Sequence, residues 1–362
     1  MLRALCRRKL RLLFRLCALT QSSRSAPEKH SRRSQVTPGG QHTSKTNTLT
    51  PNRLRLHTSA VSISERALIS EIRKRTASLR KGAVRVGIGD DCAVLSILPD
   101  EELLVTTDLC LEGMHFMREW QTPESIGRWC VTRGLSDIAA MAGRPVAAFV
   151  SFACPQDTDA AWIGSFFAGV TELAAEYDFT LAGGDTGTFP SAIIADVLLI
   201  GAAPKGAAVL RSGASPGDLI YVTGRLGAPQ AELSALLSGE LEHRSYTPVP
   251  QLKPGQKLRG TATAMIDISD GLSTDLAHIC EESGVSAEIE SSAIPIAKGA
   301  DLKAALHGGD EYQLLFTARP TTKPPIRASQ IGRIVRQRRH PVYLNDGQSK
   351  RPLANADWQH RL

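Results

Sequence analysis

From about residue 62 onward, short apolar runs alternate with longer segments of helical periodicity. The runs predict β-strands over the ranges Leu103–Thr107, Ala147–Ala153, Ala192–Gly201 and Leu219–Thr223. The helical pattern predicts α-helices over Ser125–Met141, Asp159–Tyr177 and Leu272–Glu282. Ser62 and Glu65 are spaced as a capping box, which predicts the start of a first helix there. This mixture of elements predicts an α+β or α/β fold.

Glycine and proline gather between residues 201 and 218, which predicts a boundary between two domains. We therefore expect an N-terminal domain over residues 62–205 and a C-terminal domain over 206–362. Each has the length of an ordinary domain. Residues 1–61 precede them as a basic extension that we expect to be disordered.

Charge separates this extension from the rest of the chain. Residues 1–58 contain thirteen Lys and Arg and one acid, Glu28, whereas the remainder carries 30 basic and 35 acidic residues, a net charge of −5. The mildly acidic remainder favours a site for metal cations and argues against a nucleic-acid partner. The extension itself fits an organellar transit peptide, a start codon placed too far upstream, or a basic arm, and we expect no catalytic role for it.

Composition narrows the class of protein further. The chain is 42% apolar, which is typical of a folded domain with a substantial core. No stretch approaches the ~18 to 20 consecutive apolar residues of a membrane-spanning helix, so we expect a soluble, cytoplasmic protein without a membrane partner. Its seven cysteines form no CxxC pair and no zinc-like cluster, which favours reduced thiols.

Aspartates recur beside apolar runs and glycines. The five sites hold Asp90, Asp108, Asp137, Asp185, and Asp267 with Asp270. We expect Asp267 and Ser269 to point to the same side of a strand, with Asp270 in the turn that follows. An ionised carboxylate is costly to bury alone, so five such sites need a common explanation.

Convergence of these carboxylates would demand cations, and oxygen ligands favour Mg²⁺ bound together with a polyphosphate. Any one of these aspartates could instead be a turn or capping residue. The chain has no Walker A sequence, no HRD or DFG set, no GxSxG and no HExxH. Nucleotide chemistry would therefore need another scaffold.

Eight motifs give the chain a family resemblance over roughly residues 64–360. They are VGIGDDCAVL (86–95), TTDLCLEGMHF (106–116), LSDIAAMAGRP (135–145), LAGGDT (181–186), LRSGASPGD (210–218), YVTGRLG (221–227), MIDISDGLSTDL (265–276) and GGDEYQLLF (308–316). In this order they resemble the thiamine-monophosphate kinase family of the aminoimidazole ribonucleotide synthetase-like superfamily. MIDISDGLSTDL and GIGDDCAV are specific at the family level, whereas LSD and GGD alone are not.

The resemblance implies a two-domain α+β fold, with a mixed N-terminal sheet and helices followed by a C-terminal α/β domain. It implies ATP and several Mg²⁺ ions in a cleft, and a homodimer built through the first sheet. The implied reaction is ATP-dependent phosphorylation of thiamine monophosphate to thiamine diphosphate. We expect direct in-line transfer, because charge neutralisation and positioning supply most of the catalysis of such reactions.

The resemblance also implies roles for individual residues. The implied magnesium ligands are Asp90, Thr106, Thr107, Asp108, Asp137, Asp185, Asp267 and Asp270. The implied nucleotide contacts are Gly184, Asp185, Arg211 and Ser269. The implied substrate contacts are His115, Asp310 and Trp358.

Three segments depart from the family's pattern. Gly134 stands where the family usually has Asn, and Asp310-Glu311-Tyr312-Gln313 stands for Glu-Asp-Tyr-Glu. Gln359 follows Trp358 where the family usually has Asp. These changes leave two alternatives open: another ATP-using enzyme of the superfamily, or a nucleotide-binding homologue without catalysis.

Overall fold

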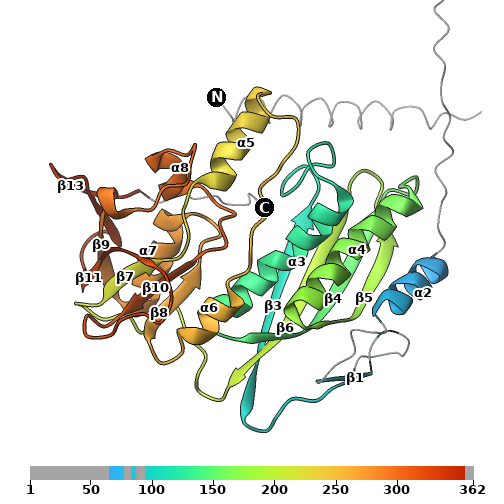
Figure 1. Cartoon of the computed structure of the whole chain (residues 1–362), viewed down its shortest axis with the longest axis horizontal. Coiled ribbons are helices and arrows are strands. Elements are labelled where there is room, and N and C mark those ends of the chain that lie inside the picture. Colours follow the sequence, from blue (N-terminus) through green and yellow to red (C-terminus); the bar gives the residue numbers. More distant parts are fainter. Residues whose placement is uncertain (1–64, 77–82, 87, 89–93, 355–362) are drawn as a thin grey trace, which may run out of the picture. The chain divides into compact units, whose positions relative to one another are not determined.

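The computed structural model describes residues 65–76, 83–86, 88 and 94–354. Within these ranges the chain forms two main β-sheets with helices packed on them, an α+β architecture (Figure 1). None of the helices in the described ranges combines the length and apolar character needed to cross a bilayer.

The first main sheet has four strands in the order β3-β6-β4-β5. Their bounds are β3 Glu101–Leu111, β4 Arg144–Cys154, β5 Thr180–Thr188 and β6 Ile194–Pro204. Strands β4 and β5 are parallel, and β6 runs antiparallel to both β3 and β4. Two long helices, α3 Pro123–Ala140 and α4 Ala160–Tyr177, lie side by side along the sheet (Figure 1).

Local sequence explains where these two helices begin. The Thr122 hydroxyl accepts the N–H of Ser125 at 3.2 Å, and the Asp159 carboxylate accepts the N–H of Ala161 at 3.0 Å. Each cap satisfies a backbone donor that has no partner within the helix. The apolar face of α4 then packs on the sheet through aromatic rings, with the Phe152 and Phe166 centroids 4.9 Å apart.

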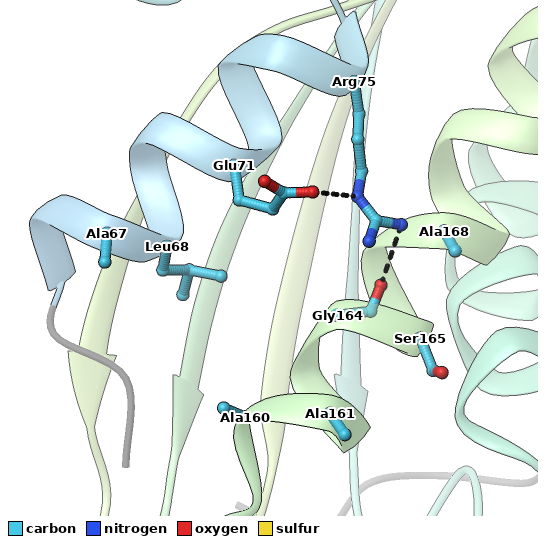
Figure 2. A pocket seen from close by; sticks show the side chains of 9 residues that line it. All are labelled: Ala67, Leu68, Glu71, Arg75, Ala160, Ala161, Gly164, Ser165 and Ala168. Atoms are coloured by element: carbon cyan, nitrogen blue, oxygen red, sulfur yellow. Dashed lines mark hydrogen bonds and ion pairs between the residues drawn. The ribbon is translucent and has the colours of Figure 1, made fainter. Parts of the chain in front are cut away.

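A short N-terminal helix, α2 Glu65–Thr76, packs against α4, near a small sheet of β1 Val84–Val86 and β2 Val94–Leu95. A hollow of about 530 Å³ lies between α2 and α4 (Figure 2). Arg75 spans it, bonded to Glu71 at 3.2 Å and to the carbonyl of Gly164 at 3.3 Å. Most of the other lining residues are small, so this hollow supplies little chemistry.

The second main sheet has seven strands in the order β13-β12-β9-β11-β7-β10-β8. Their bounds are β7 Leu219–Val222, β8 Ala262–Asp267, β9 Val285–Glu290, β10 Leu314–Ala318, β11 Ser329–Arg336, β12 Val342–Asn345 and β13 Lys350–Pro352. The helical elements of this half are α5 Ala228–Ser238, α6 Leu252–Lys257, α7 Leu272–Ser283, the 3₁₀ turn Ser291–Ala293 and α8 Leu302–His307. One buried core forms between this sheet, α7 and α8.

The opposite face of the second sheet contributes to the core of the first half. Met265, Leu314 and Phe316 belong to the same buried cluster as Leu135 on α3 and Leu252 on α6. Helix α3 therefore contacts both halves, and its C-terminal part meets the end of β8. This contact sets the position of the candidate site.

The structure confirms the predicted strands and helices, although Ser62 of the predicted capping box lies outside the described residues, and it corrects two expectations. Strand β3 continues to Leu111, so Asp108 lies inside a strand and not at its end. Strand β8 ends at Asp267, so the expectation that Ser269 continues the strand is wrong. Ser269 lies in the turn, where backbone N–H groups bond to a side chain and not to a neighbouring strand.

We expect Gly169→Ala to lower the free energy of unfolding by about 1–3 kcal/mol, because α3 and α4 approach too closely for a methyl group. A Cβ at Gly169 would lie 2.1 Å from the carbonyl oxygen of Glu124. Urea unfolding of the two variants measures this. Gly164→Ala on the same helix is the control, because its Cβ would meet nothing closer than 3.9 Å. Equal stability of both variants would contradict the packing argument.

Candidate active site

Three carboxylates from different elements meet where α3 contacts the end of β8. Asp108 comes from β3, Asp137 from the last turn of α3, and Asp267 from the last residue of β8. The Ser136 hydroxyl donates to Asp267 Oδ2 at 2.7 Å, and the Thr106 hydroxyl donates to Asp137 Oδ2 at 2.5 Å. The structure thus brings together Thr106, Asp108, Asp137 and Asp267, which sequence reasoning had placed in one site.

Burial and mutual repulsion disfavour the ionised forms of these carboxylates. Burial raises the pKa of Asp137 to about 7, and the charges of Asp267 and Asp108 add to the shift. Burial also raises the pKa of Asp267 to about 6, although the hydrogen bond from Ser136 opposes it. The pKa of Asp108 is raised by burial as well, against the opposing effect of Arg133. A bound cation would offset the cost of ionising these carboxylates.

The donor set fits a hard divalent cation. Every side-chain ligand atom of the cluster is an oxygen, which is the preference of Mg²⁺. Asp108 Oδ2 is buried, and no residue in the described ranges hydrogen-bonds to it. A buried acceptor without a partner is costly, so a ligand at this atom would remove a penalty. Arg211 adds positive charge, which lowers the pKa of both Asp137 and Asp267.

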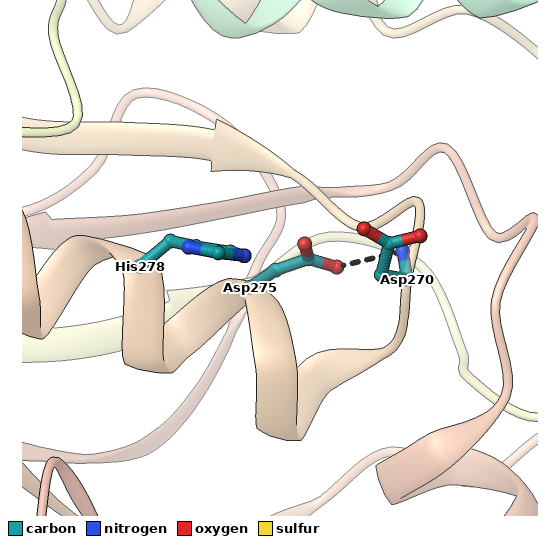
Figure 3. A group of neighbouring side chains, drawn as sticks. All are labelled: Asp270, Asp275 and His278. Atoms are coloured by element: carbon teal, nitrogen blue, oxygen red, sulfur yellow. Dashed lines mark hydrogen bonds between the residues drawn. The ribbon is translucent and has the colours of Figure 1, made fainter. Parts of the chain in front are cut away.

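A buried aspartate shapes the turn between β8 and α7. One oxygen of Asp275, Oδ2, accepts the backbone N–H groups of Ser269, Asp270 and Gly271, each at 3.1 Å. Figure 3 shows Asp275 between Asp270 and His278, and their potential ligand atoms all lie within 4.8 Å of one another. Asp275 was absent from the residues picked out by sequence. Its place in MIDISDGLSTDL, one turn into the helix, was the available signal.

Two predicted ligands lie on the other face of the first sheet. Successive residues of a strand alternate between faces, so Thr107 points away from Thr106 and Asp108. Its hydroxyl donates to Asp196 on β6 at 2.8 Å. Asp185 pairs in register with Ser151, which in turn pairs with Asp196. The structure does not bring the side chains of Thr107 and Asp185 to the three-carboxylate cluster, so their metal roles stay predictions.

Gly184 is fixed by its neighbour on β4. Its φ is +148°, and a Cβ there would lie 2.0 Å from the carbonyl oxygen of Val150. Only glycine fits this close approach of two strands. Its role as a nucleotide contact stays a prediction, as does the metal role of Asp90, which lies outside the described residues.

The segment after α8 carries the predicted substrate residue Asp310. Asp310 and Tyr312 both have left-handed backbone conformations, with φ of 62° and 52°. The Tyr312 hydroxyl donates to Asp310 Oδ1 at 3.0 Å, and Arg244 lies 3.8 Å from Asp310 Oδ2. The Arg244 guanidinium also stacks 3.8 Å from the centroid of the Trp129 ring on α3. Asp310 is thus held by Tyr312 of its own segment and by Arg244, whose guanidinium packs on Trp129 of α3.

Glu311, the other member of the exchanged pair, points into the interior. It is 1% exposed and accepts the backbone N–H of Gly227 at the start of α5. Burial raises its pKa to about 7. Of the two exchanged acids, Glu311 therefore binds the start of α5, and Asp310, which has the shorter side chain, lies beside Arg244.

Two predicted substrate contacts remain, His115 and Trp358. His115 Nδ1 accepts the N–H of Leu111 at 3.0 Å, so the ring closes the turn after β3. An acceptor Nδ1 places the proton of a neutral ring on Nε2. Trp358 lies outside the described residues. The substrate roles of both stay predictions.

Comparison with known proteins identifies the superfamily first. Residues 89–203 match the family model of the AIR synthase related protein N-terminal domain, and residues 215–344 match the model of its C-terminal domain. A Haemophilus influenzae thiamine-monophosphate kinase is 36% identical over 67% of this chain and 77% of that protein. The Escherichia coli K12 thiamine-monophosphate kinase is 36% identical over 70% and 82%.

The chain belongs to the thiamine-monophosphate kinase family. Solved structures of family members agree. The Stenotrophomonas maltophilia K279a enzyme superposes with a TM-score of 0.71 at 32% identity, covering 80% of this chain and 99% of that one. The structure of AaThiL complexed with AMPPCP and TMP superposes with a TM-score of 0.63 at 30% identity, covering 79% of this chain and 95% of that one. A hydrogenase maturation protein HypE, at 18% identity, shares the fold.

Without divalent cations, we expect Asp137→Asn to raise the melting temperature of this kinase-family chain by a few degrees at pH 8. The raised pKa of Asp137 means that the folded state holds its proton where the unfolded state has lost it. Asp137 therefore costs stability as pH rises from about 4 to its folded pKa of about 7, and Asn removes that cost. Thermal unfolding in EDTA at pH 5 and pH 8 measures the effect. An unchanged or lower melting temperature at pH 8 would contradict the electrostatic account.

Proposed function

We propose that this chain transfers the terminal phosphoryl group of ATP to thiamine monophosphate, giving thiamine diphosphate and ADP. The observation that carries the proposal is the cluster of Asp108, Asp137 and Asp267, in which burial disfavours the ionised carboxylates and bound cations would stabilise them. This cluster occurs in a member of the thiamine-monophosphate kinase family, which supports phosphorylation of thiamine monophosphate by this chain.

The proposed cofactor is Mg²⁺, in several ions, with ATP as co-substrate. Thr106, Asp108, Asp137, Asp267 and Asp270 would hold ions on the side of the sheet that faces α3. Bound Mg²⁺ would neutralise phosphate charge and link the polyphosphate to the carboxylates. Asp90, Thr107 and Asp185 are proposed as further ligands, from the resemblance.

We propose in-line transfer without a phosphoenzyme. Arg211 and Ser269 would bind phosphate oxygens of the nucleotide, and Gly184 would let the backbone approach it. Asp275 holds the turn that carries Ser269 and Asp270 through three backbone hydrogen bonds. Phosphoryl transfer needs positioning and charge neutralisation more than a covalent intermediate, and these residues supply both.

The acceptor would bind at the opposite end of the cluster. Asp310 would contact the substrate from a conformation fixed by Tyr312 and Arg244. His115 would donate from Nε2 to a phosphate oxygen, and Trp358 would stack on the heterocycle.

We expect Asp108→Asn to lower kcat at least about 100-fold, because an anionic ligand is lost where charge must be balanced. The assay couples ADP release to a visible signal in Mg·ATP with thiamine monophosphate, thiamine or no acceptor, and identifies the product by chromatography. Asp346→Asn, in an exposed turn of the second sheet, is the matched control and should stay within about twofold of wild type. Wild-type protein without acceptor-dependent ADP release would refute the proposed function. Normal turnover of the Asp108 variant in saturating Mg²⁺ would refute the metal assignment.

The proposed assembly is a homodimer through the first sheet. Strand β3 is an edge of that four-stranded sheet, and Leu103, Val105 and Leu109 expose 48%, 63% and 48% of their surface on the face away from α3. A row of exposed apolar side chains on an edge strand is suited to burial in an interface.

We expect Val105→Lys to convert a dimer to a monomer, because it would bury an unpaired charge in that interface. Size-exclusion chromatography with light scattering measures the mass. Leu98→Lys is the control, because Leu98 is 58% exposed but lies outside the strands. A wild-type monomer, or a dimer that survives Val105→Lys, would contradict the proposal.

We further propose that residues 62–205 and 206–362 are the two domains of the enzyme. Reduced buried cysteines support a cytoplasmic location, since Cys110, Cys130, Cys154 and Cys280 are free thiols.

A further inference from the structure

Arg133 lies beside the carboxylate cluster without being one of its predicted members. It is four residues before Asp137 on α3, so the two side chains share a face of the helix. Its Nε donates to Asp108 Oδ1 at 3.2 Å, and its side chain is 19% exposed. A guanidinium therefore contacts the same aspartate that is proposed to hold a cation.

Most hydrogen-bonding capacity of this guanidinium is unused. An arginine offers five N–H donors in a planar fork, and here Nε alone has a hydrogen-bond partner among the described residues. The four N–H groups of the two terminal nitrogens have no bond to another described residue and are therefore free to bind an anion beside the Asp108 carboxylate. The anchored Nε fixes the plane in which the two terminal nitrogens lie.

The position of Arg133 connects the metal end of the site with the acceptor end. An arginine side chain stays protonated in proteins, and the Arg133 guanidinium interacts electrostatically with Asp310 as well as with Asp108. Arg133 is therefore cationic at every accessible pH, with Asp108 on one side and the 310–312 segment near it. Arg244, the arginine beside Asp310, is already engaged by Glu232, Asp310 and the Trp129 ring.

We propose that Arg133 is a specificity-determining residue that binds phosphate oxygens at the point of transfer. The inference rests on the proposed function and deepens it. A planar guanidinium donates two parallel hydrogen bonds to a phosphate, which an ammonium group cannot match. The phosphate has two possible sources, the acceptor's own phosphate and the group being transferred, and steady-state kinetics separates them.

The test compares full-length Arg133→Gln and Arg133→Lys with wild type. Arg128→Gln is the matched control, because Arg128 lies on the same helix and pairs at 2.6 Å with Glu176 of α4, away from the site. We expect Arg133→Gln to lower kcat/KM for thiamine monophosphate about 10- to 100-fold, from the loss of charge-assisted hydrogen bonds. Arg133→Lys should recover part of this loss. A higher KM for thiamine monophosphate assigns the acceptor's phosphate, and a lower kcat assigns the transferred group.

A purely structural role would give a different pattern. If Arg133 only balanced the charge of Asp108, the Arg133→Gln variant would change its half-saturating Mg²⁺ concentration or its melting temperature and keep its kcat/KM in saturating Mg²⁺. That result, or kinetics equal to those of Arg128→Gln, would overturn the inference.

Failure of the proposed function can be told apart from failure of this inference. If wild type turns over no thiamine monophosphate, calorimetry in Mg²⁺ and a non-hydrolysable ATP analogue compares binding of thiamine monophosphate with binding of thiamine. A wild-type preference for the phosphorylated compound that Arg133→Gln abolishes would support the role of Arg133. A preference retained in the variant, or none in wild type, would refute it.

Discussion

Repulsion among three partly buried carboxylates is the constraint on which the rest of the site depends. Asp108, Asp137 and Asp267 come from a strand, a helix and a second strand, and each raises the cost of ionising another. Hydrogen bonds from Ser136 and Thr106 only partly offset this cost. The fold tolerates the arrangement because extensive apolar packing around α3 holds the three elements together.

Helix α3 connects this constraint to the fold. One side of it packs on the first sheet, and its C-terminal part reaches the end of β8. The helix therefore supplies Asp137 as a candidate ligand, Ser136 as a partner for Asp267, and Arg133 as a cation beside Asp108. Small shifts of α3 would change all three contacts at once, which explains the close glycine-mediated packing between α3 and α4.

The two ends of the site differ in how far they follow the family's pattern. The described members of the carboxylate cluster keep the residue types that the resemblance implies. At the proposed acceptor end, Glu311 turns inward to the start of α5, and Asp310 is held by Arg244 and Tyr312. The two exchanged carboxylates thus have different roles. Glu311 is packed in the interior, Asp310 faces the surface, and each has its own partners.

The sequence by itself predicted an α+β or α/β fold, four of the strands, four of the helices and the set of aspartates, because apolar periodicity and glycine-flanked acids are local signals. It also carried the family resemblance. Asp275 and Arg133 were not picked out from the sequence, although Asp275 lies in the MIDISDGLSTDL motif, because one acts through the backbone of a turn and the other on a strand residue 25 positions away. The separation of Thr107 from Thr106 follows from strand pleating, but which face meets the cluster depends on how α3 packs. Tertiary structure alone decided these points, because burial, repulsion and hydrogen bonding depend on distances that only the packed chain defines.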